Sequence, residues 1–415
     1  MYIDFTQEQL DYFESFKRNP REKLLNACDA DSRAVTSLTD TNSTHTFIYE
    51  HTPTMNYCNN PDLMDLHGVW AFHQTHKTRL VPMWVHCKWI QDQSFLMPAL
   101  PGFGSIIRDD AKVVPWKNRS DTRLFWRARS TGIDFATGRN WRAAHRVRLH
   151  TLATGRGGEV EVLEETPEGR LQLQQYSRGQ LNQRYMDAGL VGPLVQCKIK
   201  GDFCKKVTEE IGFLDVVPQS RGQDAKFVID VGESSVFCRR GIFLVDSNPF
   251  VDGNGWSQRY GRLLSTGSVV FKSTVFPEWN TPWLIPYYHF VVRPLLSSAD
   301  PTPMLIPSQP IKVDYSDLYD TMAFFSGYPN GQPGHDNLAE RIGANAVRFT
   351  REHWRWEDMQ AYVRLSLHFA SCSSPSWNNK LIPLALARRR SASCSNMLDC
   401  LRTIGTPRPS TLTDD

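Results

Sequence analysis

The second half of the chain alternates short apolar runs with amphipathic stretches. Residues 226–231 form a run rich in β-branched residues, which is typical of a buried parallel strand, and residues 268–272 have the same character. Apolar residues recur with helical spacing in 256–264, 315–325, 337–349 and 356–369. Strands and helices that alternate in this way predict βαβ units around a parallel sheet, and thus an α/β fold.

The first half of the chain has a weaker pattern. We expect an amphipathic helix at 7–17, a second helix at 142–149 and a short strand at 160–163. The changes of pattern along the chain divide it into a loop-rich segment 1–60, a domain 61–225, a second domain 226–370 and an irregular tail 371–415.

Two segments interrupt the second domain. The segment 232–251 separates the apolar run from Asp252-Gly-Asn-Gly, and the segment 292–309, rich in proline and serine, precedes Pro310-Ile-Lys-Val-Asp. They are either translated intron sequence or genuine surface insertions, which loops tolerate well. The segment 232–251 separates a buried strand from the turn that follows it, and this position favours intron sequence.

Composition narrows the class of protein. With 415 residues, of which 40% are hydrophobic, the chain can bury a sizeable core. A net charge of +3 gives no argument for nucleic-acid binding, and we interpret Arg388-Arg-Arg as part of a solvated tail. No apolar run reaches the roughly 20 residues that a membrane span needs. The first residues show neither the basic nor the apolar region of a secretory signal.

The nine cysteines leave the redox environment open. Cys197 and Cys204 lie seven positions apart in a turn-rich segment, and Cys28 and Cys58 flank a long loop-like stretch. Neither pair has the spacing of a zinc finger. In an oxidising compartment we expect Cys197 and Cys204 to lie close enough to form a disulfide.

The most informative stretch is Asp252-Gly-Asn-Gly-Trp-Ser-Gln-Arg, which follows a predicted strand and opens a predicted helix. A turn after a parallel strand lies at the carboxyl edge of the sheet, where ligands bind. Glycines such as Gly255 let the backbone approach a phosphate, Ser257 can donate its hydroxyl, and Arg259 can bind a diphosphate through two hydrogen bonds. The competing interpretation is a type I′ turn at Asn254-Gly255 followed by a surface arginine.

A second stretch, Phe125-Trp-Arg-Ala-Arg-Ser-Thr-Gly, contains two arginines and two hydroxyl groups before a glycine. This composition suits anion binding at the end of a strand, although such turns are common and the stretch is not specific by itself. In a third stretch, residues 141–148, helical spacing places Trp141, His145 and Arg148 on one face. A histidine at such a position is more often structural than catalytic.

A fourth stretch, Lys272-Ser-Thr-Val-Phe-Pro-Glu-Trp, is followed by Tyr287-Tyr-His. Glu278 and His289 could bind sugar hydroxyls or a ribose, and the competing interpretation is a buried polar pair. The sequence contains no catalytic triad, zinc motif, P-loop or Gly-x-Gly-x-x-Gly motif. Asp109-Asp110 and the later carboxylates lack the Asp-x-Asp pattern of the metal-dependent sugar transferases. We therefore expect neither a metal nor a cofactor.

Taken in order, these stretches resemble the capsule-associated glycosyltransferases, glycosyltransferase family 90, and the fungal branch most closely. Its relatives include protein O-glucosyltransferases of the endoplasmic reticulum and fungal xylosyltransferases. The resemblance extends from about Asn56 to Phe369. Further matching stretches are Leu263-Leu-Ser-Thr-Gly-Ser-Val-Val-Phe-Lys-Ser-Thr, Glu278-Trp, Tyr288-His, Asp314-Tyr-Ser-Asp-Leu and Glu357-Asp-Met-Gln-Ala-Tyr.

The resemblance implies a GT-B fold, in which two Rossmann-like domains flank a donor-binding cleft. Residues 61–225 would form the acceptor side, and 226–370 would bind the donor. It also implies an inverting, metal-independent transfer of xylose or glucose from a UDP-sugar to a hydroxyl of a glycan or protein. The implied donor site comprises Arg127, Ser130, Thr131, Gly132, Asn254, Gly255, Trp256, Ser257, Arg259, Glu278 and His289. In the first of its loops, Ala128 stands where the family usually has glycine.

The chain departs from the family at the general base, which an inverting transfer needs to deprotonate the acceptor hydroxyl. In the family this is an aspartate in an Asp-Glu-Pro-like or Asp-Tyr-Pro-like motif, and none occurs before Pro82. Asp4 is the nearest carboxylate in an extended context. We expect the chain to begin after that motif, and we assign no catalytic residue. The alternative function is a catalytically inactive protein that binds a UDP-sugar or a glycan.

The resemblance places the protein in the lumen of the Golgi or the endoplasmic reticulum. Sequons at Asn42 and Asn118 favour the secretory pathway only weakly, because such triplets also occur by chance. A membrane anchor would precede the residues present here, and the expected partners are the UDP-sugar donor and a glycan or protein acceptor.

Overall fold

The computed structural model describes residues 28–36, 51–66, 84–91, 94–98, 113–199, 201–231, 256–257, 259–284 and 312–373. The chain divides into a compact unit that ends at Trp354 and a second unit that begins at Arg355. The first unit is a mixed α/β structure. In the second, Arg355 binds Asp358 in the first turn of helix α12 (Trp356–Ser373), with 2.8 Å between Arg355 Nη2 and Asp358 Oδ1.

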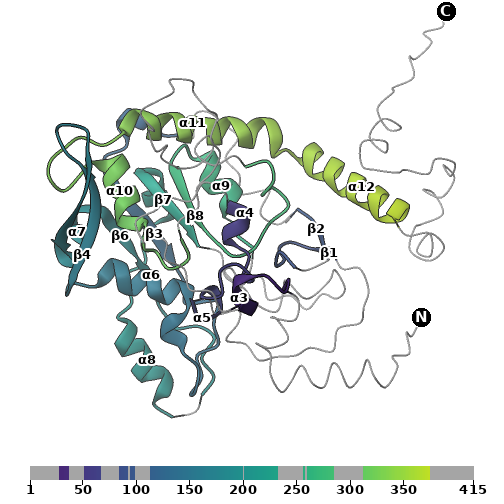
Figure 1. Cartoon of the computed structure of the whole chain (residues 1–415), viewed down its shortest axis with the longest axis horizontal. Coiled ribbons are helices and arrows are strands. Elements are labelled where there is room, and N and C mark those ends of the chain that lie inside the picture. The colour runs from purple at the N-terminus through teal and green to yellow at the C-terminus, as the bar shows by residue number, and fades with distance from the viewer. Residues whose placement is uncertain are drawn as a thin grey trace, which may run out of the picture. The chain divides into compact units, whose positions relative to one another are not determined.

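A four-stranded parallel sheet lies at the centre of the first unit (Figure 1). Its strands are β3 (Asp121–Ala128), β6 (Met186–Leu190), β7 (Ala225–Val231) and β8 (Val269–Ser273), and their spatial order is β6-β3-β7-β8. β8 is buried at every position and β7 at every position but one, as expected of parallel strands covered on both faces. The two predicted apolar strands are therefore confirmed.

Helices and turns connect these strands. After β3 come η5 (Trp141–Ala143), α6 (His145–Thr154), the hairpin β4 (Glu159–Glu165) and β5 (Leu171–Ser177), and α7 (Arg178–Tyr185). Between β6 and β7 lie α8 (Phe203–Ile211) and η6 (Gln219–Gln223). The remaining helices around the sheet are η4 (Trp116–Asn118), α9 (Tyr260–Ser265), α10 (Leu318–Ser326) and α11 (Asp336–His353).

One face of the sheet carries the main hydrophobic core. Alternate residues of β3, among them Leu124 and Trp126, pack in one cluster with Phe227 of β7, Phe271 of β8 and Phe325 of α10. Residues of α6 and α7 belong to the same cluster. These side chains share a face because successive residues of a strand point to opposite sides of the sheet.

Helices α9 and α11 pack beside β8. A side chain on Gly343 of α11 would place its Cβ 2.3 Å from the carbonyl oxygen of Gly267. Only glycine therefore allows α11 to lie this close to the turn that precedes β8.

The sheet combines strands from both sides of the expected domain boundary between residues 225 and 226. β3 and β6 precede the boundary, and β7 and β8 follow it. The other sheets within the described residues are two-stranded, a parallel pair of β1 (Trp84–Val85) and β2 (Phe95–Leu96) and the antiparallel hairpin β4–β5. Within the described residues, strands from both sides of the expected boundary thus share one parallel sheet.

Several helix boundaries differ from the predictions. α6 begins at His145 and not at Arg142, because Trp141–Ala143 form a 3-10 turn. α9 begins at Tyr260, four residues after the predicted start. The predicted strand at 160–163 corresponds to β4, and the helices predicted near 315–325, 337–349 and 356–369 correspond to α10, α11 and α12. The helix expected at 7–17 and the interruptions 232–251 and 292–309 lie outside the described residues.

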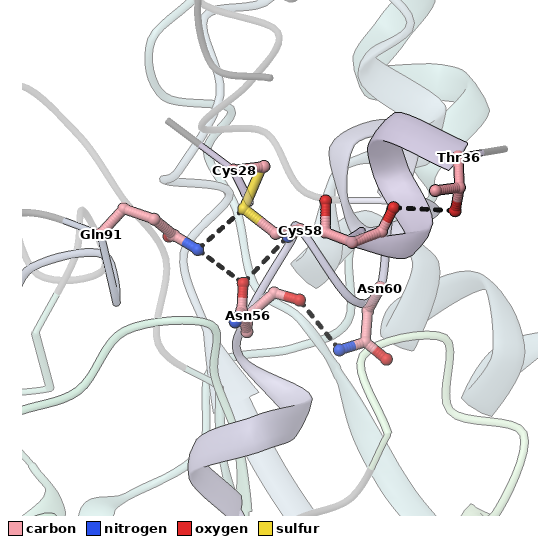
Figure 2. Close-up of a disulfide and its surroundings, with 7 residues drawn as sticks. Cys28, Thr36, Asn56, Cys58, Asn60 and Gln91 are labelled. Atoms are coloured by element: carbon pink, nitrogen blue, oxygen red, sulfur yellow. Dashed lines mark hydrogen bonds between the residues drawn. A yellow bond between two sulfur atoms is a disulfide. The ribbon is translucent and has the colours of Figure 1, made fainter. Parts of the chain in front are cut away.

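Two N-terminal segments are joined by a disulfide between Cys28 and Cys58 (Figure 2). These segments contain the short helices α3 (Arg33–Thr36), α4 (His51–Thr54) and α5 (Leu63–Leu66). Gln91 donates from Nε2 to Asn56 Oδ1 at 2.5 Å and to Cys58 Sγ at 3.0 Å, which ties a third segment to the bridge. Leu63 packs with Val275 and Phe276, so this part of the chain lies against the residues that follow β8.

The described part of the chain contains no helix that is both long enough and apolar enough to span a membrane.

Candidate functional site

The order of the strands identifies one edge of the sheet as the place for a ligand. From β3 the chain passes outward to β6, and it then returns to the other side of β3 to form β7. In open α/β sheets, ligands bind beyond the carboxyl ends of the strands at the point where the order reverses. That point lies between the ends of β3 and β7, after Ala128 and Val231.

The loop after β3 is held by its own polar groups. Ser130 Oγ accepts from the backbone N–H of Val195 at 3.1 Å, and the N–H of Gly132 donates to Gln196 Oε1 at 2.9 Å. Gly132 has φ of 102°, a conformation that favours glycine. Ser130 and Gly132, expected as ligand contacts, therefore position this loop through bonds within the protein.

Arg146, near the start of α6, ties the ends of two strands together. Its Nη1 donates to Thr131 Oγ1 at 2.6 Å and to the carbonyl oxygen of Arg129 at 3.1 Å, and its Nη2 donates to the carbonyl oxygen of Val231 at 3.2 Å. The side chain is buried. The Arg146 guanidinium thus fixes the position of the loop after β3 relative to the end of β7. The Thr131 hydroxyl accepts a hydrogen bond from this group.

The Arg127 side chain lies against the neighbouring strand β6. Its Nη2 lies 2.5 Å from Asp187 Oδ1 of β6, and its Nη1 donates to the carbonyl oxygen of Asp187 at 2.7 Å. These contacts hold the Arg127 guanidinium against the neighbouring strand. Its carbonyl oxygen accepts a hydrogen bond from Arg259, which is described below.

Three buried charged groups lie together beside the ends of β7 and β8. Lys272 Nζ lies 2.7 Å from Asp230 Oδ2 and 2.7 Å from Glu278 Oε1. Asp230 and Lys272 are partners in the parallel register of the two strands. The ammonium also lies 4.0 Å from the centre of the Tyr260 ring. Each buried charge is therefore paired, as burial of a charge requires.

The two carboxyl groups of this cluster differ in acidity. Burial acts to raise the pKa of Asp230, but the positive charges of Lys272 and Arg259 and the hydrogen bonds from Lys272 and Ser257 lower it below its ordinary value. Burial raises the pKa of Glu278 despite the attraction of Lys272, and the nearby charge of Asp230 adds to that rise. Glu278 is thus the group that accepts a proton more readily.

Ser257 and Arg259 connect this cluster to the loop after β3. Ser257 Oγ donates to Asp230 Oδ1 at 2.5 Å, and its backbone N–H binds Glu278. Arg259 Nη1 donates to the carbonyl oxygen of Arg127 at 3.2 Å. Arg259 is half-buried, and within the described residues its Nε and Nη2 have no hydrogen-bond partner.

Two histidines also lie at this edge. His145 Nε2 lies 3.0 Å from Ser273 Oγ at the end of β8, and its ring stacks on Tyr315 with 5.2 Å between ring centres. His51 is buried, and burial and the charge of Lys272 lower its pKa well below the ordinary value, while a hydrogen bond with the Thr274 backbone opposes this. His51 is therefore neutral near pH 7.

The structure brings together four of the predicted positions. Ser257 and Glu278 contact one another within the cluster, Arg259 lies close enough to Asp230 to lower its pKa, and Arg259 also contacts Arg127. Trp256 packs edge-on against His86, which was not predicted, at 5.1 Å between ring centres. Asn254, Gly255 and His289 lie outside the described residues. Cys197 and Cys204, the predicted pair, are joined by a disulfide with Cα atoms 6.0 Å apart.

Asp230, Lys272, His51 and Arg146 were not predicted as site residues. A signal for Asp230 was present, because a carboxylate within the apolar run of β7 must find a buried partner. Lys272 likewise is a charged residue within the apolar run of β8 and must find a buried partner. Nothing in the local sequence around His51 indicates its place beside Lys272.

The arrangement suits the binding of an anion. At the carboxyl edge of the parallel sheet, the half-buried Arg259 guanidinium has a hydrogen-bond partner within the described residues only at Nη1, whereas the Lys272 ammonium and the Ser257 hydroxyl are engaged by Asp230 and Glu278. Among the described residues there is no group of three or more His, Cys, Asp or Glu side chains that could hold a metal ion.

No protein-family model matches the chain. No curated protein shows a significant match to it either.

Proposed function

We propose that this chain binds a UDP-sugar at the carboxyl edge of its sheet and descends from a metal-independent, inverting glycosyltransferase of GT-B type. The transferred sugar is xylose or glucose, and the acceptor is a hydroxyl of a glycan or protein. The proposal rests on the resemblance of the ordered motifs to glycosyltransferase family 90.

The observation that carries the proposal is the contact between Arg259 and Arg127. The two residues belong to separate motifs of the resemblance, and the hydrogen bond between them spans 132 positions of the chain. Within the described residues, Arg259 Nε and Nη2 have no hydrogen-bond partner, and these groups can bind a diphosphate in the forked geometry that arginine favours. In a site without a metal, an arginine must stabilise the charge of the leaving UDP.

The paired carboxylates favour the alternative of a binding protein without catalysis. Asp230 and Glu278 are the carboxylates closest to Lys272, and both are bound to it. A carboxylate held in this way is poorly placed to take a proton from an acceptor hydroxyl. Transfer therefore depends on a base that the motifs do not supply, whereas nucleotide binding does not.

Disulfides support a lumenal location in the endoplasmic reticulum or Golgi. Cys28–Cys58 and Cys197–Cys204 are both bridged, and such bonds persist in oxidising compartments. Asn118 of the second sequon is exposed, as glycosylation requires.

Calorimetric titration with UDP tests the proposal. Charge-assisted hydrogen bonds contribute roughly 1.5 to 3 kcal/mol each, so Arg259→Ala should weaken UDP binding by about 10- to 100-fold. Arg259→Lys should restore only part of the affinity, because lysine cannot form the forked pair. The affinity for uridine, which lacks the diphosphate, should change little in either variant.

Arg142→Ala is the matched control. Arg142 is an exposed arginine bound to Glu210, and its removal should leave UDP affinity unchanged. The proposal would be contradicted if the wild-type chain did not bind UDP, or if Arg259→Ala bound UDP as tightly as the wild-type chain. Hydrolysis or transfer from UDP-xylose or UDP-glucose would then separate the transferase from the inactive binding protein.

A further inference from the structure

A second basic site lies at the opposite, amino-terminal edge of the same sheet. A pocket with a volume of about 590 Å³ lies beside the first residues of β3, and its lining includes Arg123, Arg184 and Arg221. Its acidic lining residues are Asp121 and Asp224. A strand rises about 3.3 Å per residue, which places this pocket about 20 Å from the loop after β3. The pocket thus lies away from the loop after β3, although the Asp187 carboxylate that contacts Arg123 and Arg221 also binds Arg127 through its other oxygen.

Asp121 arranges two of these arginines. Arg123 binds Asp121 through Nε and Nη2, both at 3.1 Å, and Arg221 binds the same carboxylate through Nη2. Asp187 lies 3.3 Å from Arg221 Nη2 and 3.7 Å from Arg123 Nη2. The Asp121 carboxylate therefore fixes both guanidinium planes at the pocket.

These ion pairs leave N–H groups unused. Within the described part of the chain, Arg221 has no hydrogen-bond partner for Nε or Nη1, and Arg123 has none for Nη1. The Arg123 and Arg221 side chains are 39% and 31% exposed, so a ligand can reach them. Donors that are held in position and accessible suit a planar or tetrahedral oxyanion.

Arg184 adds a third guanidinium from another element. It is in the last turn of α7, and its Nη2 donates to the carbonyl oxygens of Tyr328 at 3.0 Å and Gly327 at 3.4 Å. It also stacks over Tyr185. Its contacts within the described residues include no carboxylate, so its positive charge is not neutralised by an ion pair.

Charged groups of both signs meet at the pocket, and Asp187, which contacts Arg123 and Arg221, brings a further carboxylate to it. Three arginines and two aspartates line it. Burial acts to raise the pKa of Asp121, but its bonds to Arg123 and Arg221 lower it below the ordinary value, so the group stays ionised.

We infer that this pocket binds a small ligand through a phosphate or sulfate group. Arg123, Arg184 and Arg221 would contact the oxyanion, and the remaining volume would hold the group attached to it. A volume of about 590 Å³ exceeds the need of a free ion and falls within the range of small-molecule pockets. The inference goes beyond the proposed function and does not depend on it.

Titration of the full chain with inorganic phosphate, inorganic sulfate and glucose 6-phosphate at physiological ionic strength tests this. We expect saturable binding, with glucose 6-phosphate tighter than the free ions if the attached group is also held. Arg221→Gln and Arg184→Gln should each weaken binding by about tenfold or more, because each removes one charge-assisted contact. If circular dichroism shows that Arg184→Gln does not fold, Arg123→Gln replaces it in the test.

Two controls separate this pocket from general charge effects and from the nucleotide site. Arg142→Gln removes an exposed, ion-paired arginine elsewhere and should leave the affinity unchanged. Arg259→Ala should also leave it unchanged. Absence of saturable binding, an equal loss in Arg142→Gln, or full affinity in the folded pocket variants would overturn the inference. Preference for the free ions over glucose 6-phosphate would identify free phosphate or sulfate as the ligand.

Discussion

The buried ammonium of Lys272 is the residue on which the candidate site depends most directly. It is 5% exposed and lies between Asp230, which is fully buried, and Glu278, which is 8% exposed. Two carboxylates this close would repel one another without the positive charge between them. The pKa of Lys272 is raised accordingly: burial acts to lower it, and the two carboxylates more than offset burial.

We predict that Lys272→Met destabilises the protein strongly. The change leaves two buried carboxylates without a partner, and loss of one member of a buried pair costs about 3 to 5 kcal/mol. Urea unfolding at neutral pH measures the free energy of unfolding. The triple variant that adds Asp230→Asn and Glu278→Gln removes the unpaired charges and should recover part of the loss. A cost below about 1 kcal/mol for Lys272→Met alone would contradict the buried ion cluster.

At the scale of elements, the loop that precedes α8 supports the loop that follows β3. Val195 and Gln196 bind Ser130 and Gly132, and the next residue, Cys197, is bridged to Cys204 in α8. The disulfide therefore anchors a loop that positions the switch point of the sheet.

We predict that Cys197→Ser with Cys204→Ser lowers the free energy of unfolding by about 2 to 3 kcal/mol, from the loop-closure entropy of so short a ring. Urea unfolding of the two chains under oxidising conditions measures this difference. Mass spectrometry of non-reduced peptides from the wild-type chain should show Cys197 linked to Cys204. Free thiols at both positions in secreted material would show the bridge to be absent.

A second element-scale prediction concerns the start of α10. Asp317 precedes this helix, is 1% exposed, and accepts hydrogen bonds from the backbone N–H of Lys312 at 3.0 and 3.2 Å. Burial raises its pKa to about 8, with further contributions from the charges of Asp314 and Asp320, although Lys312 opposes the rise.

The raised pKa gives a pH dependence of definite sign. Between its ordinary pKa of 3.8 and about 8, the folded chain holds a proton on Asp317 that the unfolded chain has released. Stability should therefore fall as pH rises through this window, by at most about 1.4 kcal/mol per pH unit from this group, and level off above it. Asp317→Asn should remove this part of the slope, and Asp314→Asn, a change at an exposed position, should reduce it only in part, because burial raises the pKa of Asp317 more than the charge of Asp314 does. Urea unfolding at pH 5, 6, 7 and 8 measures the slopes, and equal slopes in wild type and Asp317→Asn would exclude the effect.

The elements that could be predicted from the sequence are those with a complete local pattern. β7, β8 and the long helices have it, because strands buried on both faces are continuously apolar and amphipathic helices repeat every three to four residues. β3 does not, because its charged residues Asp121, Arg123 and Arg127 alternate with apolar ones and bind Asp187 of β6 and Arg221 of η6. Its strand character depends on contacts that the local sequence does not contain.

The site follows the same division. Ser257, Arg259 and Glu278 could be proposed from turn chemistry and the family motifs. Asp230 and Lys272 stand 42 positions apart and meet because the two parallel strands pair in that register. Such a pair can be predicted only when the register of the two strands is known. The position of His51 beside Lys272 likewise depends on how an N-terminal segment packs.

At the scale of the whole molecule, the connection from β7 to the site is much longer than the geometry requires. β7 ends at Val231, and Ser257 Oγ already lies 2.5 Å from Asp230 Oδ1. Removal of 232–251 would leave residues 252–256 to connect the two, and five extended residues span roughly 17 Å. That reach exceeds what two residues in side-chain contact need, so the shorter connection can close.

We therefore predict that the chain without 232–251 folds and binds UDP at least as tightly as the full chain. Shortening the loop from 25 to 5 residues lowers its closure cost by about 1.4 kcal/mol, and the free energy of unfolding should rise by a similar amount. Calorimetry with UDP and urea unfolding measure the two effects. Replacement of 232–251 by a Gly/Ser linker of equal length is the control, and it should return the stability toward that of the full chain, since only length is restored. A deletion variant that aggregates, or that folds but loses UDP affinity, would show that 232–251 contributes to the fold or to the site, and would favour a genuine insertion over intron sequence.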